Sequence, residues 1–158
     1  MHRPFHGPTL QLTQRLSMNP VEPPPNDTKG SERAAGGGNP TRILIVEDEF
    51  LIALELEYRL RDAGFEVIGI AATAGEALSI AASGRPALAI MDIRLAGHTD
   101  GIQAAIELNA TLGVRSIFAS AHADPETRKR AAAASPIGWL QKPYPADALI
   151  NLIRQHLS

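Results

Sequence analysis

The chain has 158 residues, 44% of them hydrophobic, which is enough for one domain of ordinary size plus an additional segment. A formal net charge of −2 argues against a nucleic-acid partner or a polybasic membrane-binding surface. The absence of cysteine excludes a disulfide framework, a thiolate metal site and a cysteine nucleophile, and it fits a reducing cytosol. No stretch approaches the roughly 18 apolar residues that a membrane helix needs, so we expect a cytoplasmic protein.

Residues 1–40 differ in composition from the rest of the chain. They hold 7 of the 12 prolines and 5 of the 13 glycines, without any repeat period. We therefore predict a disordered tail and linker over residues 1–40 and one folded domain over residues 41–158. The tail lacks the apolar core of a secretory signal, and its arginines leave a transit peptide open as the alternative to a solvated tail.

From Thr41 onward, short apolar runs alternate with longer amphipathic segments. The runs predict strands at residues 42–46, 65–70, 87–92, 114–119 and 137–141. The longer segments predict helices at residues 49–63, 75–83, 100–111, from 124 onward, and 146–157. Five strands that alternate with five helices predict an α/β fold with a parallel sheet and right-handed crossovers.

Details of the helices follow from the same pattern. Ile52, Leu56 and Leu60 predict the inner face of the first helix, and Gly64 and Gly84 predict the ends of the first two. In the fourth helix, Asp124 is the expected N-cap and Pro125 the first helical residue. The alanines at residues 131–134 offer little apolar area, so we expect this helix to be the most mobile. The last helix should turn four residues inward: Leu149, Leu152, Ile153 and Leu157.

Acidic residues stand at the carboxyl ends of two predicted strands. Glu47 and Asp48 follow residues 42–46, and Asp92 closes residues 87–92. If these strands are neighbours, the three carboxylates lie together at one edge of the sheet. Such a cluster repels itself unless a cation neutralises it, and hard oxygen ligands favour Mg²⁺. The pattern predicts a doubly wound sheet in the order 2-1-3-4-5, with a magnesium site between the first and third strands.

Two further strands end on residues that suit phosphate chemistry. Ser120 follows residues 114–119, and Lys142 follows residues 137–141. Metal-bound acids would neutralise phosphoryl oxygens, the ammonium group would bind a further oxygen, and the hydroxyl would donate a hydrogen bond. Asp92 would then attack phosphorus, with no need for a general base because a carboxylate is ionised at neutral pH.

Five motifs resemble, in order and spacing, the receiver domain of two-component response regulators. They are Ile43-Leu-Ile-Val-Glu47-Asp48-Glu49, Met91-Asp92-Ile93-Arg94, Asp100-Gly101, Phe118-Ala119-Ser120-Ala121 and Trp139-Leu140-Gln141-Lys142-Pro143. The resemblance covers residues 41–158 and implies a flavodoxin-like (βα)5 fold. It also implies that Asp92 takes a phosphoryl group from a sensor histidine kinase or a phosphotransfer protein. The chain would then be a signalling phosphoacceptor, not an enzyme that acts on a separate substrate.

The resemblance also implies a role for each site residue. Asp48 and Asp92 would ligate Mg²⁺ together with the main-chain carbonyl of Arg94, while Glu47 would hold a metal-bound water. Ser120 and Lys142 would grip the phosphoryl group.

Other implied roles concern the response of the domain to phosphorylation. Ser120 and Trp139 would form the switch pair, although Trp139 replaces the usual Tyr or Phe. The peptide bond before Pro143 should be cis. Arg94 and His122 stand where the family tunes the lifetime of the phosphoryl group. Residues 118–121 are similar to the Phe-Ala-Thr-Gly segment of a receiver subgroup that is typically single-domain.

Three functions are compatible with the fold expected from these motifs. Because the chain ends one helix after Lys142, we expect a stand-alone receiver that signals by phosphorylation-dependent protein contact or acts as a phosphate shuttle or sink. A magnesium-dependent phosphohydrolase with an aspartyl-phosphate intermediate would want a second Asp where Arg94 stands. A receiver-like scaffold that is never phosphorylated is disfavoured by the intact set of site residues. The sequence names no downstream target, and the fourth and fifth helices offer a surface for a homodimer.

Overall fold

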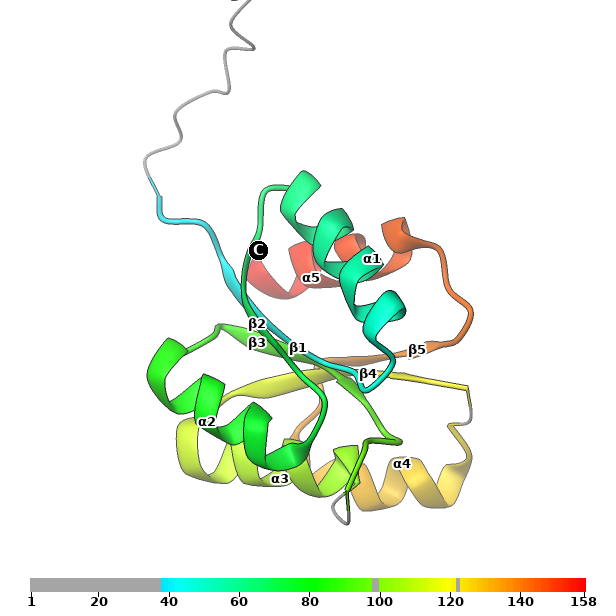
Figure 1. Cartoon of the computed structure of the whole chain (residues 1–158). Coiled ribbons are helices and arrows are strands. Elements are labelled where there is room, and N and C mark those ends of the chain that lie inside the picture. The colour runs from blue at the N-terminus through cyan, green and yellow to red at the C-terminus, as the bar shows by residue number, and fades with distance from the viewer. Residues whose placement is uncertain (1–37, 98–99, 122) are drawn as a thin grey trace, which may run out of the picture. The chain divides into compact units, whose positions relative to one another are not determined.

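A computed structural model describes residues 38–97, 100–121 and 123–158. Residues 1–37 of the predicted tail lie outside the described residues. The centre of the described part is a five-stranded parallel sheet with helices on both faces (Figure 1). The strands follow the order β2-β1-β3-β4-β5, which confirms the predicted order and places β1 beside β3. Their bounds are β1 (Arg42–Val46), β2 (Glu66–Ala71), β3 (Leu88–Asp92), β4 (Arg115–Ser120) and β5 (Gly138–Gln141).

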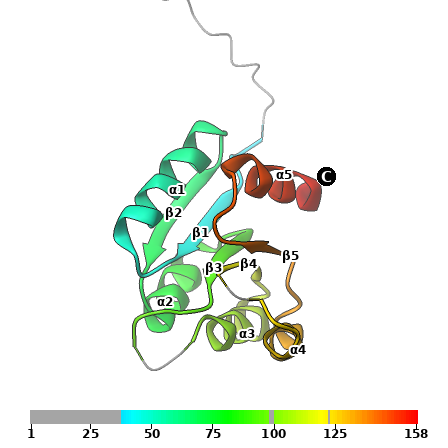
Figure 2. The same cartoon turned by 90° about the vertical axis from the view of Figure 1, so that its right-hand side faces the viewer.

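Helices α1 and α5 cover one face of the sheet, and α2, α3 and α4 cover the other (Figure 1 and Figure 2). Among the described residues, no helix is both long enough and apolar enough to span a membrane. The helices are α1 (Phe50–Asp62), α2 (Ala74–Gly84), α3 (Gly101–Leu112), α4 (Pro125–Ala131) and α5 (Ala146–Leu157), with a short 3-10 helix η1 (Ala132–Ala134) after α4.

The three central strands are buried on both sides, as continuous apolar runs predict. Leu44, Met91 and Phe118 pack into the core beneath α2 and α3. Ile45 and Ile90 pack into the opposite core, with buried residues of α1 and α5. The carboxyl edge of the sheet, where β1 and β3 end, is therefore held between two packed layers.

The inner face of α1 differs from the prediction. Ala53 and Leu60 are buried, whereas Ile52 is 39% exposed and Leu56 is half-buried. The predicted row used a spacing of four residues, and such a row drifts by about 40° at each step around a helix of 3.6 residues per turn. Leu60 is buried as predicted, and its buried partner is Ala53, seven residues earlier, which is close to two full turns.

Two further helix ends also correct the sequence analysis. Helix α2 ends with Arg85 in the left-handed region at φ 45°, and Gly84 is its last helical residue. A Cβ at Gly84 would lie 2.5 Å from Cδ1 of Ile68, so this glycine permits close packing on β2. In α5, Leu149 and Ile153 are buried as predicted, but Leu157 is 44% exposed in the last turn.

Helix α4 begins as predicted but is short. Asp124 caps it by accepting a hydrogen bond from the Thr127 amide at 2.9 Å. Ala131 and Ala134 are completely buried, and η1 packs against α3. Small side chains here allow the backbone to approach the core closely.

Candidate functional site

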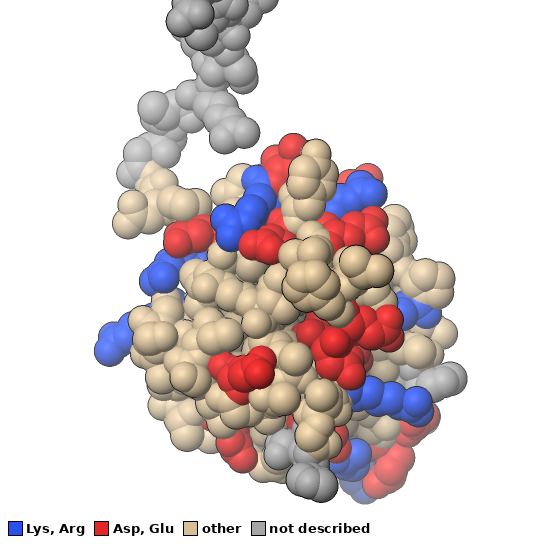
Figure 3. Space-filling view, in the orientation of Figure 1, with Lys and Arg blue, Asp and Glu red and all other residues tan. Residues whose placement is uncertain are grey.

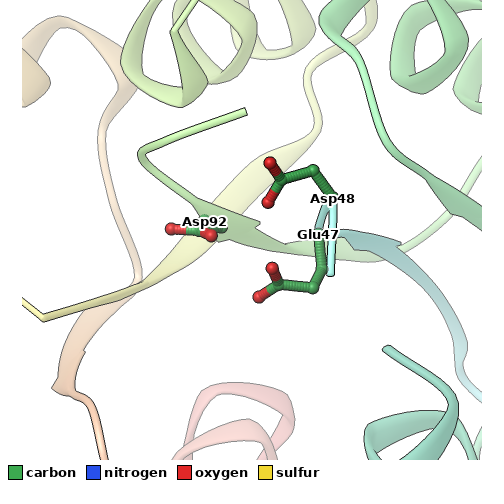
Figure 4. Close-up of side chains that lie close together, drawn as sticks. All are labelled: Glu47, Asp48 and Asp92. Atoms are coloured by element: carbon green, nitrogen blue, oxygen red, sulfur yellow. The ribbon is translucent and has the colours of Figure 1, made fainter. Parts of the chain in front are cut away.

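Three carboxylates meet where β1 and β3 end. Glu47 and Asp48 directly follow β1, and Asp92 is the last residue of β3. One carboxylate oxygen from each lies within 4.8 Å of those of the other two. Figure 4 shows the three side chains pointing toward a common space. These carboxylates were predicted to lie side by side, and they do so because β1 and β3 are neighbours in the sheet.

Glu47 is held tightly by its surroundings. Its side chain is 5% exposed, and its amide donates to the carbonyl of Ala71 at 2.9 Å. Its Oε1 accepts a hydrogen bond from the Glu49 amide at 3.1 Å. Burial raises the pKa of this carboxyl above its ordinary value, although the hydrogen bonds from Lys142 and Glu49 act in the opposite direction. Negative charge in this position therefore needs a cation nearby.

Lys142 reaches into the cluster from the end of β5. Its Nζ donates to Oε2 of Glu47 at 2.6 Å and lies 3.4 Å from Oδ2 of Asp92. Burial lowers the pKa of this lysine, but the hydrogen bond to Glu47 and the charge of Asp92 outweigh burial and raise it above its ordinary value. The ammonium group is therefore charged at neutral pH, and it balances part of the carboxylate charge.

The main chain fixes Lys142 beside β4. Its amide donates to the carbonyl of Ser120 at 2.8 Å, and its peptide bond to Pro143 is cis. Ser120 ends β4 and is 6% exposed, one residue beyond Ala119, which lies level with Asp92. Ser120 and Lys142 thus stand at the same edge of the sheet as the carboxylates.

The turn after Asp92 is ordered by local hydrogen bonds. The Arg94 amide donates to Oδ1 of Asp92 at 3.3 Å, and the Gly101 amide donates to the Ile93 carbonyl at 2.7 Å. The Arg94 side chain is exposed, and its role in tuning the lifetime of the phosphoryl group stays a prediction. His122, the other residue assigned to lifetime tuning, lies outside the described residues.

Trp139 of β5 contacts one residue of β4 and one of α4. Its ring stacks on Phe118 with centroids 4.6 Å apart and an interplanar angle of 25°. The guanidinium carbon of Arg128 lies 4.9 Å from the centroid of the Trp139 ring. Sequence analysis assigned Trp139 a switch role but missed its contact with Arg128.

A groove beside the carboxylate cluster was also missed. It has a volume of about 610 Å³ and is lined by residues of α1 and of the segment after β5, among them Ile52, Leu56, Pro143 and Tyr144. Lys142 also borders it, so the groove opens next to the cluster. Of the consecutive apolar residues that begin α1, Ile52 lines the groove, but it was assigned to the core in the sequence analysis.

The donor set suits a hard divalent cation. The three carboxylates offer oxygen ligands, and one lysine cannot balance all three negative charges. The face of the molecule seen in Figure 3 carries a group of acidic side chains near its centre. Oxygen ligands in a partly exposed site fit Mg²⁺, which keeps several waters when bound to protein carboxylates.

Comparison with known protein families and curated proteins gives a consistent result. The family model of the response regulator receiver domain matches residues 43–154. The chain is 39% identical over 132 residues to the phyllosphere-induced regulator PhyR of Methylorubrum extorquens and 33% identical over 129 residues to the transcriptional regulatory protein PdtaR of Mycobacterium tuberculosis. These alignments cover 83% and 82% of this chain but only 48% and 62% of the two relatives.

Solved structures give the same fold. The signal receiver domain of a modulated diguanylate cyclase from Desulfovibrio desulfuricans G20 is 37% identical, with a TM-score of 0.69, and the match covers 74% of this chain and 93% of that one. A CheY-like response regulator receiver domain protein from Methanospirillum hungatei JF-1 is 29% identical, with a TM-score of 0.69 and coverage of 75% and 94%. Both matches extend over nearly the whole length of the two solved receiver domains, so the fold of this chain is the fold of these domains.

Proposed function

The chain belongs to the response regulator receiver family, and on this premise we propose that Asp92 accepts a phosphoryl group from a phosphohistidine of a histidine kinase or phosphotransfer protein. The observation that carries the proposal is the meeting of Glu47, Asp48 and Asp92 with the ammonium group of Lys142. Nucleophile, cation-binding oxygens and a fixed positive charge are what phosphoryl transfer to a carboxylate requires.

Each residue has a part in this proposed step. A carboxylate oxygen of Asp92 attacks phosphorus as the bond from phosphorus to the donor nitrogen breaks, and no proton need be removed from the nucleophile. Lys142 Nζ already lies 3.4 Å from Oδ2 of Asp92, close enough to bind an oxygen of the incoming group. Ser120 would donate its hydroxyl hydrogen bond from the end of β4.

Asp48, Asp92 and the main-chain carbonyl of Arg94 would hold Mg²⁺, and Glu47 would hold one of its waters. The ion would supply charge neutralisation at the phosphoryl oxygens. Both carboxylate oxygens of Glu47 accept hydrogen bonds, from the Glu49 amide and from Lys142, which supports Asp48 and Asp92 as the direct ligands.

The exposed start of α1, which follows the carboxylates at the end of β1 in the chain, supports a place for the phosphodonor. Leu51 and Phe50, at the start of α1, are 78% and 67% exposed, and both follow closely after Asp48. A donor that delivers phosphorus to Asp92 must cover this edge, and its apolar side chains could pack against those of α1. The phosphorylated chain would then signal by contact with a downstream protein or pass its phosphoryl group on.

Intact-mass analysis tests the proposal. The purified chain is incubated with Mg²⁺ and acetyl phosphate, beside Asp92→Ala and the control Asp147→Ala, which removes an exposed acid on α5. We expect a gain of one phosphoryl group in the wild type and the control, and none in Asp92→Ala or after chelation of Mg²⁺. Absence of any gain while Mg²⁺ binds would contradict the proposal. Steady consumption of acetyl phosphate without accumulation would favour the phosphohydrolase.

A further inference from the structure

Gly101, the first residue of α3, lies directly against the end of β3. A Cβ at this position would overlap the carbonyl oxygen of Asp92 and lie 2.8 Å from both the Asp92 carbonyl carbon and Cα of Ile93. All three are backbone atoms, which cannot swing aside as the end of a flexible side chain could. Helix α3 can therefore begin this close to the acceptor residue only because position 101 has no side chain.

Hydrogen bonds fix the same contact. The Gly101 amide donates to the Ile93 carbonyl at 2.7 Å. Asp100, the N-cap of α3, accepts from the Gln103 amide at 2.9 Å and from Nη2 of Arg130 at 2.7 Å. The first turn of α3 is thus tied to its own helix, to α4 and to the chain that follows Asp92.

The segment in contact with Gly101, which runs from Asp92 to Arg94, carries two groups of the proposed metal site. One is the Asp92 carboxylate, whose Oδ1 accepts from the Arg94 amide at 3.3 Å. The other is the main-chain carbonyl of Arg94, two residues further on. Any shift of Ile93 moves both groups, because only one residue separates them.

We propose that Gly101 is a positioning residue for the phosphoacceptor. Its contact with the main chain of Asp92 and Ile93 sets the direction of the Asp92 carboxylate and of the Arg94 carbonyl. Through them it sets the affinity for Mg²⁺ and the rate of phosphorylation. The inference rests on the proposed function and adds a residue that touches neither metal nor phosphate.

The test compares the same substitution at the two ends of α3. Gly113 ends the helix at φ 67° with no atom within 4 Å of an added Cβ, so Gly113→Ala strains the backbone far from the site. Mg²⁺ affinity is measured by calorimetry, and the rate of phosphorylation by acetyl phosphate is measured at saturating Mg²⁺. For Gly101→Ala we expect at least a tenfold loss of Mg²⁺ affinity and slower phosphorylation even when Mg²⁺ saturates.

Gly113→Ala should bind Mg²⁺ as the wild type does, whatever stability it loses. Wild-type Mg²⁺ affinity and rate in Gly101→Ala would overturn the inference, and so would an equal loss in Gly113→Ala. If the wild type binds Mg²⁺ but takes no phosphoryl group, the proposed function fails, while the Mg²⁺ affinities of the two variants still test the positioning role.

A second pair of variants covers the case in which Gly101→Ala does not fold. Asp100→Ala and Asp100→Ser both remove the charge, but serine still caps a helix and alanine does not. Neither substitution adds atoms next to Asp92, so the two variants differ in whether the first turn of α3 keeps an N-cap. We expect Asp100→Ala to bind Mg²⁺ several-fold more weakly than Asp100→Ser. Equal affinities in this pair would count against the inference.

Discussion

The guanidinium group of Arg128 on α4 lies over the indole ring of Trp139 on β5, with its Cζ 4.9 Å from the ring centroid. The same ring stacks on Phe118 of β4 at 4.6 Å between centroids. A cation over the face of tryptophan is attracted by the negative charge of the ring face. This contact joins α4 to the residue that the family resemblance assigns to the switch.

Arg128→Ala should therefore loosen α4 and change the surroundings of the single tryptophan. We expect the free energy of unfolding to fall by about 0.5–1 kcal/mol, the range for exposed cation–π pairs, and the emission of Trp139 to change. Urea unfolding followed by fluorescence measures both. Lys129→Ala removes the same charge from an exposed neighbour on α4 and serves as the control. Identical behaviour of the two variants would show that the contact contributes nothing.

Lys142→Met leaves the buried Glu47 carboxylate without its ion-pair partner. Because Glu47 is 5% exposed, we expect the variant to lose about 2 kcal/mol of unfolding free energy in the absence of Mg²⁺. Mg²⁺ affinity should rise, because a positive charge next to the cluster is gone, and saturating Mg²⁺ should restore part of the lost stability. Thermal unfolding with and without Mg²⁺ checks this, with Lys129→Met as the surface control. An unchanged Mg²⁺ affinity would contradict the arrangement of charges described for the site.

Asp100 gives the protein a defined acid sensitivity. Burial acts to raise its pKa, but hydrogen bonds from the Gln103 amide and Arg130 and the charge of Arg130 lower it below the ordinary 3.8. The unfolded chain then binds more protons than the folded one, so this contribution is fully present above about pH 4 and is lost as the pH falls through the folded-state pKa.

Asp100→Asn keeps a capping side chain but removes the charge. We expect the wild type to be the more stable protein near neutral pH, and the difference in unfolding free energy to shrink as the pH falls below about 4. Urea unfolding at several pH values measures the difference. A difference that stays constant, or that grows with acidity, would contradict the direction of the pKa shift.

Leu51→Glu tests the exposed apolar start of α1 as the docking place of the donor. The residue is 78% exposed, so the substitution should leave the free energy of unfolding nearly unchanged. Phosphotransfer from a phosphorylated histidine kinase that serves the wild type should slow by roughly tenfold or more, the effect of losing an interface contact of about 1.4 kcal/mol. Labelling by acetyl phosphate, which needs no docking, should keep the wild-type rate. Equal slowing with both donors would mean that the substitution damages the site itself.

The fold could be predicted because each strand of the sheet stands out as a short apolar run. The order β2-β1-β3-β4-β5 followed from one further observation, that Glu47, Asp48 and Asp92 close two of these runs. The carboxylate cluster was predictable for the same reason, since the carboxyl ends of parallel strands share one edge.

The features that the sequence could not predict depend on how helices sit on the sheet. Ile52 and Leu157 were expected to be buried, but both are partly exposed. Ile52 is exposed because of the rotation of α1 about its axis, and Leu157 because it lies in the last turn of α5. The contact of Arg128 with Trp139 and that of Arg130 with Asp100 join residues 11 and 30 positions apart, and no periodic pattern encodes them. The expected mobility of α4 stays a prediction, and these two contacts of α4 act against it.

The central claim is that Asp92 is the residue that carries the phosphoryl group. Borohydride reduces an acyl phosphate to an alcohol, so treatment of the phosphorylated chain should convert the phosphorylated Asp into homoserine. Peptide mapping by mass spectrometry then identifies the position. We expect homoserine at position 92 alone, and only after phosphorylation in the presence of Mg²⁺. Homoserine at another acidic position, or a phosphoryl group that survives reduction on a serine or histidine, would contradict the account.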